Sequence, residues 1–233
     1  MNNKMYTIHV VMLVLLAELL VSCQCEKKYQ VVVRLDDNLV TIDGMGNEAA
    51  WQGVDDYITL SNPWGEPSPK TTLALTADSR NLYFFFDVDD DEILLEPEYT
   101  GKRDVEKEDR VELFLSKDKK MNDYYCFEID AEGRTLSYRC SYYRNFDFDW
   151  PPPSGFHVAC QIRPGGYSVE GCIPMDFLRG FIQKGNQVYF GAYRAEFSKK
   201  NGHIIENWQS WINPSTSEPD FHVPMSLGVM VLK

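Results

Sequence analysis

The feature that most limits the possible folds is a succession of short segments rich in β-branched and aromatic residues, separated by Gly, Asp, Asn and Pro. Such segments favour β-strands, and the residues between them favour turns. We expect strands at 71–77, 81–88, 110–116, 124–130, 135–143, 156–162, 167–173, 187–197 and 226–232. Helix is expected only in a turn at 47–51 and in 174–181, where Pro174 suits a first helical position. Many short strands at this spacing predict an all-β domain, either a sandwich or a barrel.

The N-terminus is typical of an exported protein. Lys4 is followed by an apolar run, residues 8–21, which is too short for a spanning helix and reads as a secretory signal. The four residues ending at Cys23, Leu-Val-Ser-Cys, fit the pattern at which bacterial lipoproteins are cleaved and lipidated. The alternative is an ordinary secretory signal with an incidental cysteine. We expect Cys23 to be lipidated, because a small residue, Ser22, directly precedes it. The acyl chains would then hold the protein firmly on a membrane.

The predicted organisation follows from this cleavage site. Residues 1–22 form a lipoprotein signal peptide, residues 23–38 form the lipidated tether and first strand, and residues 39–233 form one β-sandwich domain. The protein is then expected in the bacterial cell envelope, lipid-anchored in the outer membrane and facing either the periplasm or the surface.

The composition restricts the class of partner. With 44% hydrophobic residues, the chain can bury the core of a globular domain. Its net charge of −12 would repel nucleic acids and anionic lipid headgroups, so neither is expected to bind. Neutral ligands remain open.

The cysteines of the body lie in two pairs, each flanking a predicted hairpin turn. Cys126 and Cys140 flank one turn, and Cys160 and Cys172 flank the other. An exported protein can form disulfides, so a bridge within each hairpin is one possibility and reduced, partly buried thiols are the other. Because no CxxC or Cys/His spacing appears, no metal site is assigned to them.

The segment 109–116, DRVELFLS, carries an unusual polar face. Alternation places Val111, Leu113 and Leu115 on one face of the strand. The opposite face carries Arg110, Glu112 and Phe114, which we expect to be exposed. Solvation alone would require only polar residues, so a charge pair beside an aromatic ring suggests a binding surface. The alternative is a surface salt bridge of little energetic weight.

A series of motifs across residues 40–232 resembles the family 9 carbohydrate-binding modules. The series comprises Ile42-Asp43-Gly44, Glu48-Ala49-Ala50-Trp51, Leu82-Tyr83-Phe84, Val88-Asp89-Asp90, Asp109-Arg110-Val111-Glu112-Leu113-Phe114, Tyr124-Tyr125, Phe127-Glu128-Ile129-Asp130, Gly133, Tyr167-Ser168-Val169-Glu170, Ile173-Pro174 and Leu227-Gly228-Val229-Met230-Val231-Leu232. The resemblance implies an antiparallel β-sandwich with one or two short helices, in agreement with the expected strands.

The resemblance also implies a sugar site with a carboxylate at Glu112, where two tryptophans clamp a terminal sugar. By spacing, the first clamp position falls near Glu106 or Lys107, which cannot stack as an indole does, and the second falls at Phe221. Glu128 stands where a known binder has a basic side chain. The clamp is therefore expected to be incomplete and binding to be weak.

Other residues could supplement this site. Arg194 offers a planar fork of donors on the expected strand 187–197, although an ion pair with Glu112, Glu128 or Glu196 is equally open. Trp51 is expected in the core, and Trp64 lies on a loop where it could either bind or pack. Trp208 and Trp211 are three residues apart, so at most one should face a site. The candidate carbohydrate-binding residues are Glu112, Arg194, Phe221, Glu128, Tyr193, Trp150 and Trp211.

The expected function is that of a non-catalytic carbohydrate-binding lipoprotein. It would bind a neutral plant-type or other oligo- or polysaccharide in support of glycan degradation, with a glycoside hydrolase as a possible partner. No catalytic residue and no required cofactor are assigned, although a structural calcium could bind the acidic run containing Asp87, Asp89 and Asp90.

Two further functions stay open. The first is a glycosidase or hydrolase accessory with unrecognised carboxylates, because the chain has 35 acidic residues but no hydrolase motif such as G-x-S-x-G or H-E-x-x-H. The second is a haem or redox module that would bind through His222 and Met225.

Cys23→Ala should release the protein from membranes, because it removes the atom that would carry the diacylglycerol. Membrane fractionation with an alkaline wash measures this. A variant that still partitions wholly with the membrane would show that the lipoprotein assignment is wrong.

Overall fold

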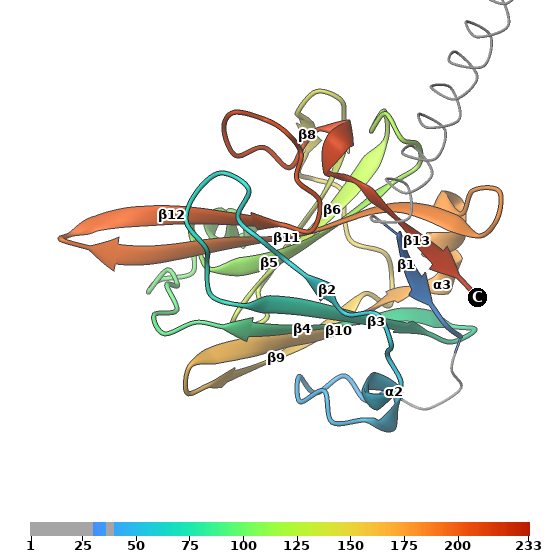
Figure 1. Cartoon of the computed structure of the whole chain (residues 1–233), viewed down its shortest axis with the longest axis horizontal. Helices are drawn as coiled ribbons and strands as arrows, with labels where there is room; N and C mark the ends of the chain where they lie inside the picture. The colour runs from blue at the N-terminus through green and yellow to red at the C-terminus, as the bar shows by residue number, and fades with distance from the viewer. Residues whose placement is uncertain (1–29, 36–39) are drawn as a thin grey trace, which may run out of the picture. The chain divides into compact units, whose positions relative to one another are not determined.

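The structure is a computed structural model that describes residues 30–35 and 40–233, and these residues form two β-sheets (Figure 1). The predicted signal peptide and Cys23 lie outside the described residues. Strand order in the larger, eight-stranded sheet is β1-β13-β11-β5-β6-β7-β8, with β12 paired to β11, and order in the five-stranded sheet is β2-β3-β4-β10-β9. The predicted all-β sandwich is confirmed.

The strands of the larger sheet are β1 (Gln30–Val33), β5 (Arg110–Ser116), β6 (Tyr124–Asp130), β7 (Thr135–Ser141), β8 (Asn145–Asp147), β11 (Gln187–Lys200), β12 (His203–Ser210) and β13 (Gly228–Leu232). Those of the smaller sheet are β2 (Ile58–Thr59), β3 (Thr71–Ala77), β4 (Asn81–Asp89), β9 (His157–Arg163) and β10 (Gly166–Pro174). The helices are α2 (Ala49–Gln52), α3 (Met175–Leu178) and the 3₁₀ turns η1 (Lys102–Lys107), η2 (Arg179–Phe181) and η3 (Pro224–Ser226). Within the described part of the chain, no helix has the length and apolarity to cross a membrane.

The hairpin of β11 and β12 differs from the expectation, because β12 was not predicted and β11 is longer than predicted. Asn201 and Gly202 join the two strands, and both have positive φ, 53° and 79°. The cross-strand pair that closes the turn is Lys200 and His203. An Asn-Gly turn of this kind suits the twist of a hairpin. The Asn201-Gly202 dipeptide was the feature of the sequence from which the second strand of this hairpin could have been predicted.

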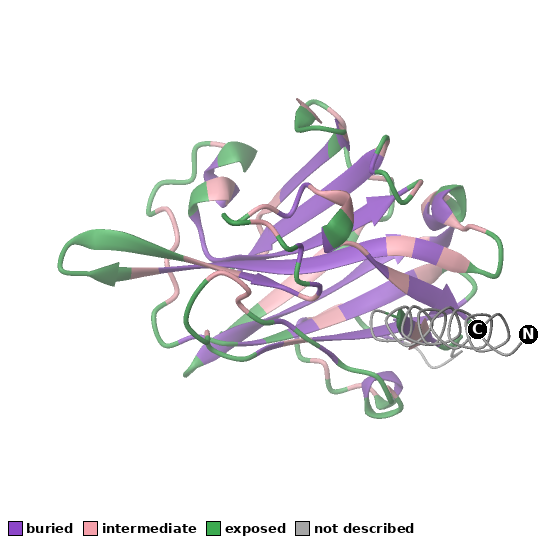
Figure 2. Ribbon diagram, turned by 45° about the horizontal axis from the view of Figure 1, so that its top comes forward, coloured by how far each residue is buried: buried purple, intermediate pink, exposed green. Residues whose placement is uncertain are grey.

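The main core lies between the two sheets and is formed by the apolar face expected for β5. Val111, Leu113 and Leu115 are buried there together with residues of the other sheet such as Phe84 and Phe86. Period-2 alternation alone therefore predicted correctly which side chains of β5 face the second sheet. Figure 2 shows that buried residues run along the strands of both sheets.

The opposite face of β5 is not exposed, contrary to the expectation. Every residue of β5 and of β6 is buried, and Glu112 is only 2% exposed. A second apolar cluster covers this outer face of the sheet and includes Phe114, Tyr124, Leu136 and Tyr193. Loops therefore bury a charged and aromatic surface that the strand pattern alone would leave in water.

Trp51 lies in the core as expected, at the end of α2. Its Nε1 donates to Oε1 of Glu170 at 2.8 Å, and Oε2 of Glu170 accepts from the backbone nitrogens of Gly44 and Asp43. This buried carboxylate on β10 thus fixes the segment that precedes α2. Each of these three hydrogen bonds satisfies a group that would otherwise be buried without a partner.

The four cysteines of the described chain are free thiols. On β9 and β10, Cys160 pairs with Val169 and Cys172 pairs with His157, so the two thiols are offset by three residues and lie on opposite faces. The bridge considered within that hairpin is therefore excluded by geometry. Cys126 lies opposite Tyr138 and Cys140 opposite Tyr124, which places these two thiols diagonally on one face.

Arg194 on β11 connects the two sheets. Its guanidinium donates to Thr71 of β3 at 3.1 Å, to the backbone oxygen of Asp89 at 3.0 Å and to the carboxylate of Asp90 at 2.8 Å. The Arg194 side chain is 0% exposed. A charge buried to this degree requires its counter-ion, because an unpaired ion in the interior is strongly unfavourable.

We expect Asp90→Asn to reduce the free energy of unfolding by about 3–5 kcal/mol, since it leaves the Arg194 charge buried without its partner. Chemical denaturation of the wild type and the variant measures the change. Asp87→Asn is the matched control, because Asp87 lies on β4, just before Asp90, and forms an exposed ion pair with Arg163. That variant should cost about 0–1 kcal/mol. Equal losses in the two variants would contradict the proposed role of Arg194.

Candidate functional site

A cavity of about 340 Å³ opens on the outer face of the eight-stranded sheet. This volume is at the lower end of the range for small-molecule sites. Strands β5, β6 and β7 contribute its base, and β12, η1 and the segments 144–148 and 219–222 contribute its walls. The lining residues are Glu106, Arg110, Glu112, Glu128, Tyr138, Arg144, Phe146, Phe148, Trp208, Pro219, Asp220, Phe221 and His222.

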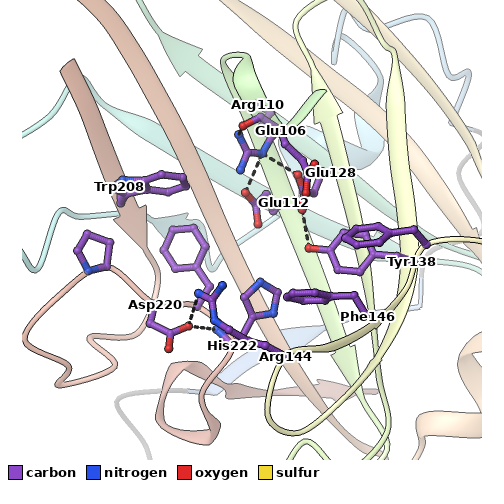
Figure 3. A pocket seen from close by; sticks show the side chains of 13 residues that line it. Glu106, Arg110, Glu112, Glu128, Tyr138, Arg144, Phe146, Trp208, Asp220 and His222 are labelled. Carbon is purple, nitrogen blue, oxygen red and sulfur yellow. Dashed lines mark hydrogen bonds and ion pairs between the residues drawn. The ribbon is translucent and has the colours of Figure 1, made fainter. Parts of the chain in front are cut away.

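The base of the cavity carries one cation between two carboxylates (Figure 3). Nε of Arg110 lies 3.0 Å from Oε1 of Glu112 and 2.7 Å from Oε2 of Glu128. The two glutamates are directly opposite each other on β5 and β6, so their side chains emerge side by side. The hydroxyl of Tyr138 donates to Oε1 of Glu128 at 2.5 Å and fixes that carboxylate from the other side.

One carboxylate oxygen of this group has no hydrogen bond. The single hydrogen on Nε of Arg110 is directed at Glu112, so the short contact of Nε with Oε2 of Glu128 is an ion pair without a hydrogen bond. No donor within residues 30–35 and 40–233 bonds this oxygen. A buried acceptor left unpaired costs free energy. Because this oxygen is itself enclosed, a ligand in the cavity would contact the side chains that line it, among them Arg110, Glu112 and Glu128.

The electrostatics of the group favour retention of a proton. Burial raises the pKa of Glu112 to about 8, and the charge of Glu128 adds to this effect. Burial also raises the pKa of Glu128, against the opposing effect of Arg110. Burial by itself would lower the pKa of Arg110, but the two glutamates outweigh it and raise the pKa. At neutral pH, the pair therefore holds a proton beside a permanent cation.

Aromatic side chains flank the carboxylates on two sides. Trp208 comes from β12, beyond β11, and Phe148 follows β8, on the far side of β7. In the sheet order, β5 and β6 lie between these two flanks, and both aromatic rings are half-buried. Trp208 packs edge-on against Phe221 at 5.7 Å, and Phe148 packs against Tyr138 at 5.0 Å. The cavity thus combines a polar base with apolar walls.

The remaining wall is built around Asp220. Its carboxylate accepts from Arg144 at 2.9 Å, from the hydroxyl of Tyr143 at 2.6 Å and from the backbone nitrogen of His222 at 2.9 Å. Nδ1 of His222 lies 3.0 Å from the Tyr124 hydroxyl. Burial lowers the pKa of His222 to about 3, and Arg144 contributes to this shift, so the imidazole is neutral.

Three of the candidate residues line this cavity: Glu112, Glu128 and Phe221. Tyr193 shares their face but lies beneath Phe221, which stacks on it at 4.3 Å. Arg194, the next residue on β11, faces the other sheet and pairs with Asp90, so the expectation that it shares a face with Glu112 is wrong.

The two candidate tryptophans are half-buried and pack against the core between the sheets. Trp150 packs on Tyr125 at 4.9 Å, and Trp211 packs on Phe190 at 5.8 Å. Trp208 reaches the cavity and Trp211 does not, which agrees with the expectation that at most one of the two faces a site. Trp64 donates its Nε1 to Thr216 and packs beside the cavity wall.

Cavity residues that were not among the candidate carbohydrate-binding residues are Trp208, Tyr138, Phe146, Phe148, Arg144 and Asp220. Most of them lie on loops or on the unpredicted strand β12. The alternation within β7 places Tyr138 on the same face as Leu136 and Cys140, and this was the signal that could have identified it. Asp220 had no comparable signal, because loop conformation depends on tertiary contacts.

The structure also places the residues that were suggested as ligands of calcium and of haem. Asp87 and Asp90 are paired with Arg163 and Arg194. Met225 is 63% exposed, whereas His222 is 9% exposed.

Comparison with known proteins supports one family. The family model described as "Carbohydrate family 9 binding domain-like" matches residues 42–233. No curated protein matches the chain.

Two solved structures share the fold. A family 9 carbohydrate-binding module from Caldicellulosiruptor kristjanssonii in complex with cellotriose has a TM-score of 0.64 and 17% identity, covering 88% of this chain and 93% of that one. A family 9 module from the same organism in complex with glucose has a TM-score of 0.56 and 19% identity, covering 88% of this chain and 95% of that one. The chain belongs to the carbohydrate family 9 binding domain-like family, as the match over residues 42–233 shows.

Proposed function

We propose that this protein is a non-catalytic, lipid-anchored binding protein that holds a neutral sugar ring in the cavity above Glu112 and Glu128. The observation that carries the proposal is the cavity itself, where the polar group of Arg110, Glu112 and Glu128 lies between aromatic side chains on two sides. A sugar hydroxyl can donate to a carboxylate and accept from a neighbouring donor at the same time.

The walls of the cavity suit the rest of a sugar. A pyranose has apolar C–H faces that pack on aromatic rings and equatorial hydroxyls that require fixed polar partners. Trp208 and Phe148 supply aromatic surface on either side of the polar base. Glu106 and Phe221, the positions expected for the family clamp, also border the cavity, but Glu106 offers no ring. In this protein the stacking surfaces would come from Trp208 and Phe148 instead.

The solved neighbours suggest the class of sugar. Those proteins are recorded in complex with cellotriose and with glucose, which are neutral. We therefore propose neutral β-linked glucan or xylan oligosaccharides as ligands. Because one clamp position carries Glu106, we expect a dissociation constant nearer ~1 mM than ~1 μM, a difference of about 4 kcal/mol.

Binding is favoured over hydrolysis by the arrangement of the two glutamates. Catalytic carboxylates of glycosidases flank the scissile bond from two sides. Here, Glu112 and Glu128 stand side by side on paired strands and share Arg110. This geometry presents acceptors to one face of a ligand. The proposal includes anchoring in the cell envelope through Cys23, which rests on the Leu-Val-Ser-Cys motif. It also includes support of a partner hydrolase, which rests on the resemblance to the family.

Trp208→Ala should weaken the binding of cello- or xylo-oligosaccharides by about 1–2 kcal/mol, roughly tenfold, because it removes one stacking surface. Isothermal titration calorimetry measures the affinity, and a thermal melt verifies folding. Tyr57→Ala removes an exposed aromatic residue that does not line the cavity and should leave binding unchanged. Unaltered affinity in a well-folded Trp208 variant would refute the proposed site.

Glu112→Gln should make stability less dependent on pH. The pKa of Glu112 is raised from 4.5 to about 8, so the folded protein retains a proton that the unfolded chain loses. This contribution is complete below pH 4.5 and is lost as the pH rises to about 8. Between pH 5 and 8 the wild type should therefore lose stability more steeply than the variant.

Chemical denaturation at pH 5 and pH 8 measures this difference. Glu98→Gln, at an exposed position, is the control and should behave as the wild type. Some slope should remain in every variant, because burial also raises the pKa of Glu108 and of Asp109, each to about 7. The same slope in the Glu112 variant as in the wild type would contradict the prediction.

A further inference from the structure

Two thiols and an imidazole meet in the apolar layer beside the cavity. Cys126 on β6, Cys140 on β7 and His222 each offer one ligand atom, and these atoms all lie within 4.8 Å of one another. The residues are 0%, 2% and 9% exposed. His222 is at least 82 positions from either cysteine in the sequence, so only the fold brings the three residues together.

The sheet register explains why the two thiols converge. Cys126 lies opposite Tyr138, and Cys140 lies opposite Tyr124, so the cysteines are diagonal neighbours on the outer face of the sheet. His222 reaches them from the segment that closes the cavity, and its backbone is held by Asp220. The Tyr124 hydroxyl, 3.0 Å from Nδ1 of His222, adds an oxygen atom to the same group.

This diagonal arrangement suits a metal better than a disulfide. Diagonal cross-strand pairs have Cα atoms about 7–8 Å apart. A disulfide requires about 4.4–6.8 Å. Ligand atoms around tetrahedral zinc lie ~3.5–3.8 Å apart, given metal–ligand distances of ~2.0–2.3 Å. The three atoms here need to approach by only about 1 Å to reach that spacing.

The net charge of the metal and its ligands favours Zn²⁺ over Cu⁺. Two thiolates, a neutral imidazole and Zn²⁺ have a net charge of zero, whereas the same ligands around Cu⁺ leave one negative charge. The cluster lies among apolar and aromatic side chains that include Phe114 and Leu136. Burying an uncompensated charge in such surroundings is costly. The neutral combination is therefore the stable one.

We propose that Cys126, Cys140 and His222 bind zinc behind the carbohydrate cavity, with a neutral oxygen, from water or from the nearby Tyr124 hydroxyl, as the fourth ligand. His222 lines the cavity and also belongs to the ligand group, so a bound ion fixes the position of one cavity wall. The site does not depend on sugar binding, and it would exist even if the cavity held another ligand.

Zinc binding to the full-length protein tests the proposal. The protein is purified in detergent, treated with a chelator and a reductant, and titrated with ZnCl₂ in competition with a chromogenic chelator. We expect one equivalent to bind and the melting temperature to rise, because an ion that binds only the folded state stabilises it. Titration with Co²⁺ should give a thiolate-to-metal charge-transfer band, which reports sulfur ligation directly.

Substitutions identify the ligands. Cys126→Ser and Cys140→Ser should each weaken zinc binding at least ~100-fold, since even the loss of a group that only supports a ligand costs 10–100-fold. Cys172→Ser is the matched control, because Cys172 is also buried but lies outside the group, and it should bind zinc as the wild type does. His222→Gln should weaken binding and remove no sulfur band.

Several results would overturn the proposal. One is the absence of stoichiometric zinc uptake by the reduced, folded wild type, and another is a cobalt complex without the sulfur band. Equal zinc affinity in the Cys126, Cys140 and Cys172 variants would also overturn it. A Cys126–Cys140 disulfide found by peptide mapping of the protein isolated without reductant would assign the pair to redox chemistry instead. The wild-type titration remains decisive if a cysteine variant fails to fold.

Discussion

Burial of both faces of β5 and β6 is the constraint on which the rest of this structure depends. One face forms the core against the five-stranded sheet, and the other lies under loops and aromatic side chains. A strand buried on both sides cannot hydrate its polar residues, so each must find a partner within the protein. Arg110, Glu112 and Glu128 meet this requirement mainly through one another, and the same three side chains form the polar base of the cavity.

Arg110 determines how two glutamates can share that cavity. A single guanidinium cannot neutralise both carboxylates, so the pair keeps a proton at neutral pH, as the raised pKa values of Glu112 and Glu128 indicate. The result is a site with a nearly balanced charge in a strongly acidic protein. Such a site suits neutral hydroxyl ligands, because it offers hydrogen-bonding groups without a large field that would select ions.

The walls of the cavity and the proposed zinc site share one structural origin. The segment that carries Asp220, Phe221 and His222 crosses the outer face of the sheet, closes the cavity and supplies the imidazole beside Cys126 and Cys140. Loops carry many binding residues because rigid strands hold them in place. Here the strands also supply the thiols, so an ion bound at this point would stabilise the loop on which the cavity depends.

The sequence by itself determined most of the strands, the alternation of β5 and the family. Burial of one face of a strand imposes a period-2 pattern on neighbouring residues, as in Val111, Leu113 and Leu115. The sequence also indicated Glu112 and Glu128 through the family motifs. It could not place Arg194, whose position one residue beyond Tyr193 turns it toward Asp90 and away from the cavity. Trp208, Phe148 and the group of Cys126, Cys140 and His222 were decided only by the tertiary structure, because strand register and loop packing bring together residues that no local spacing connects.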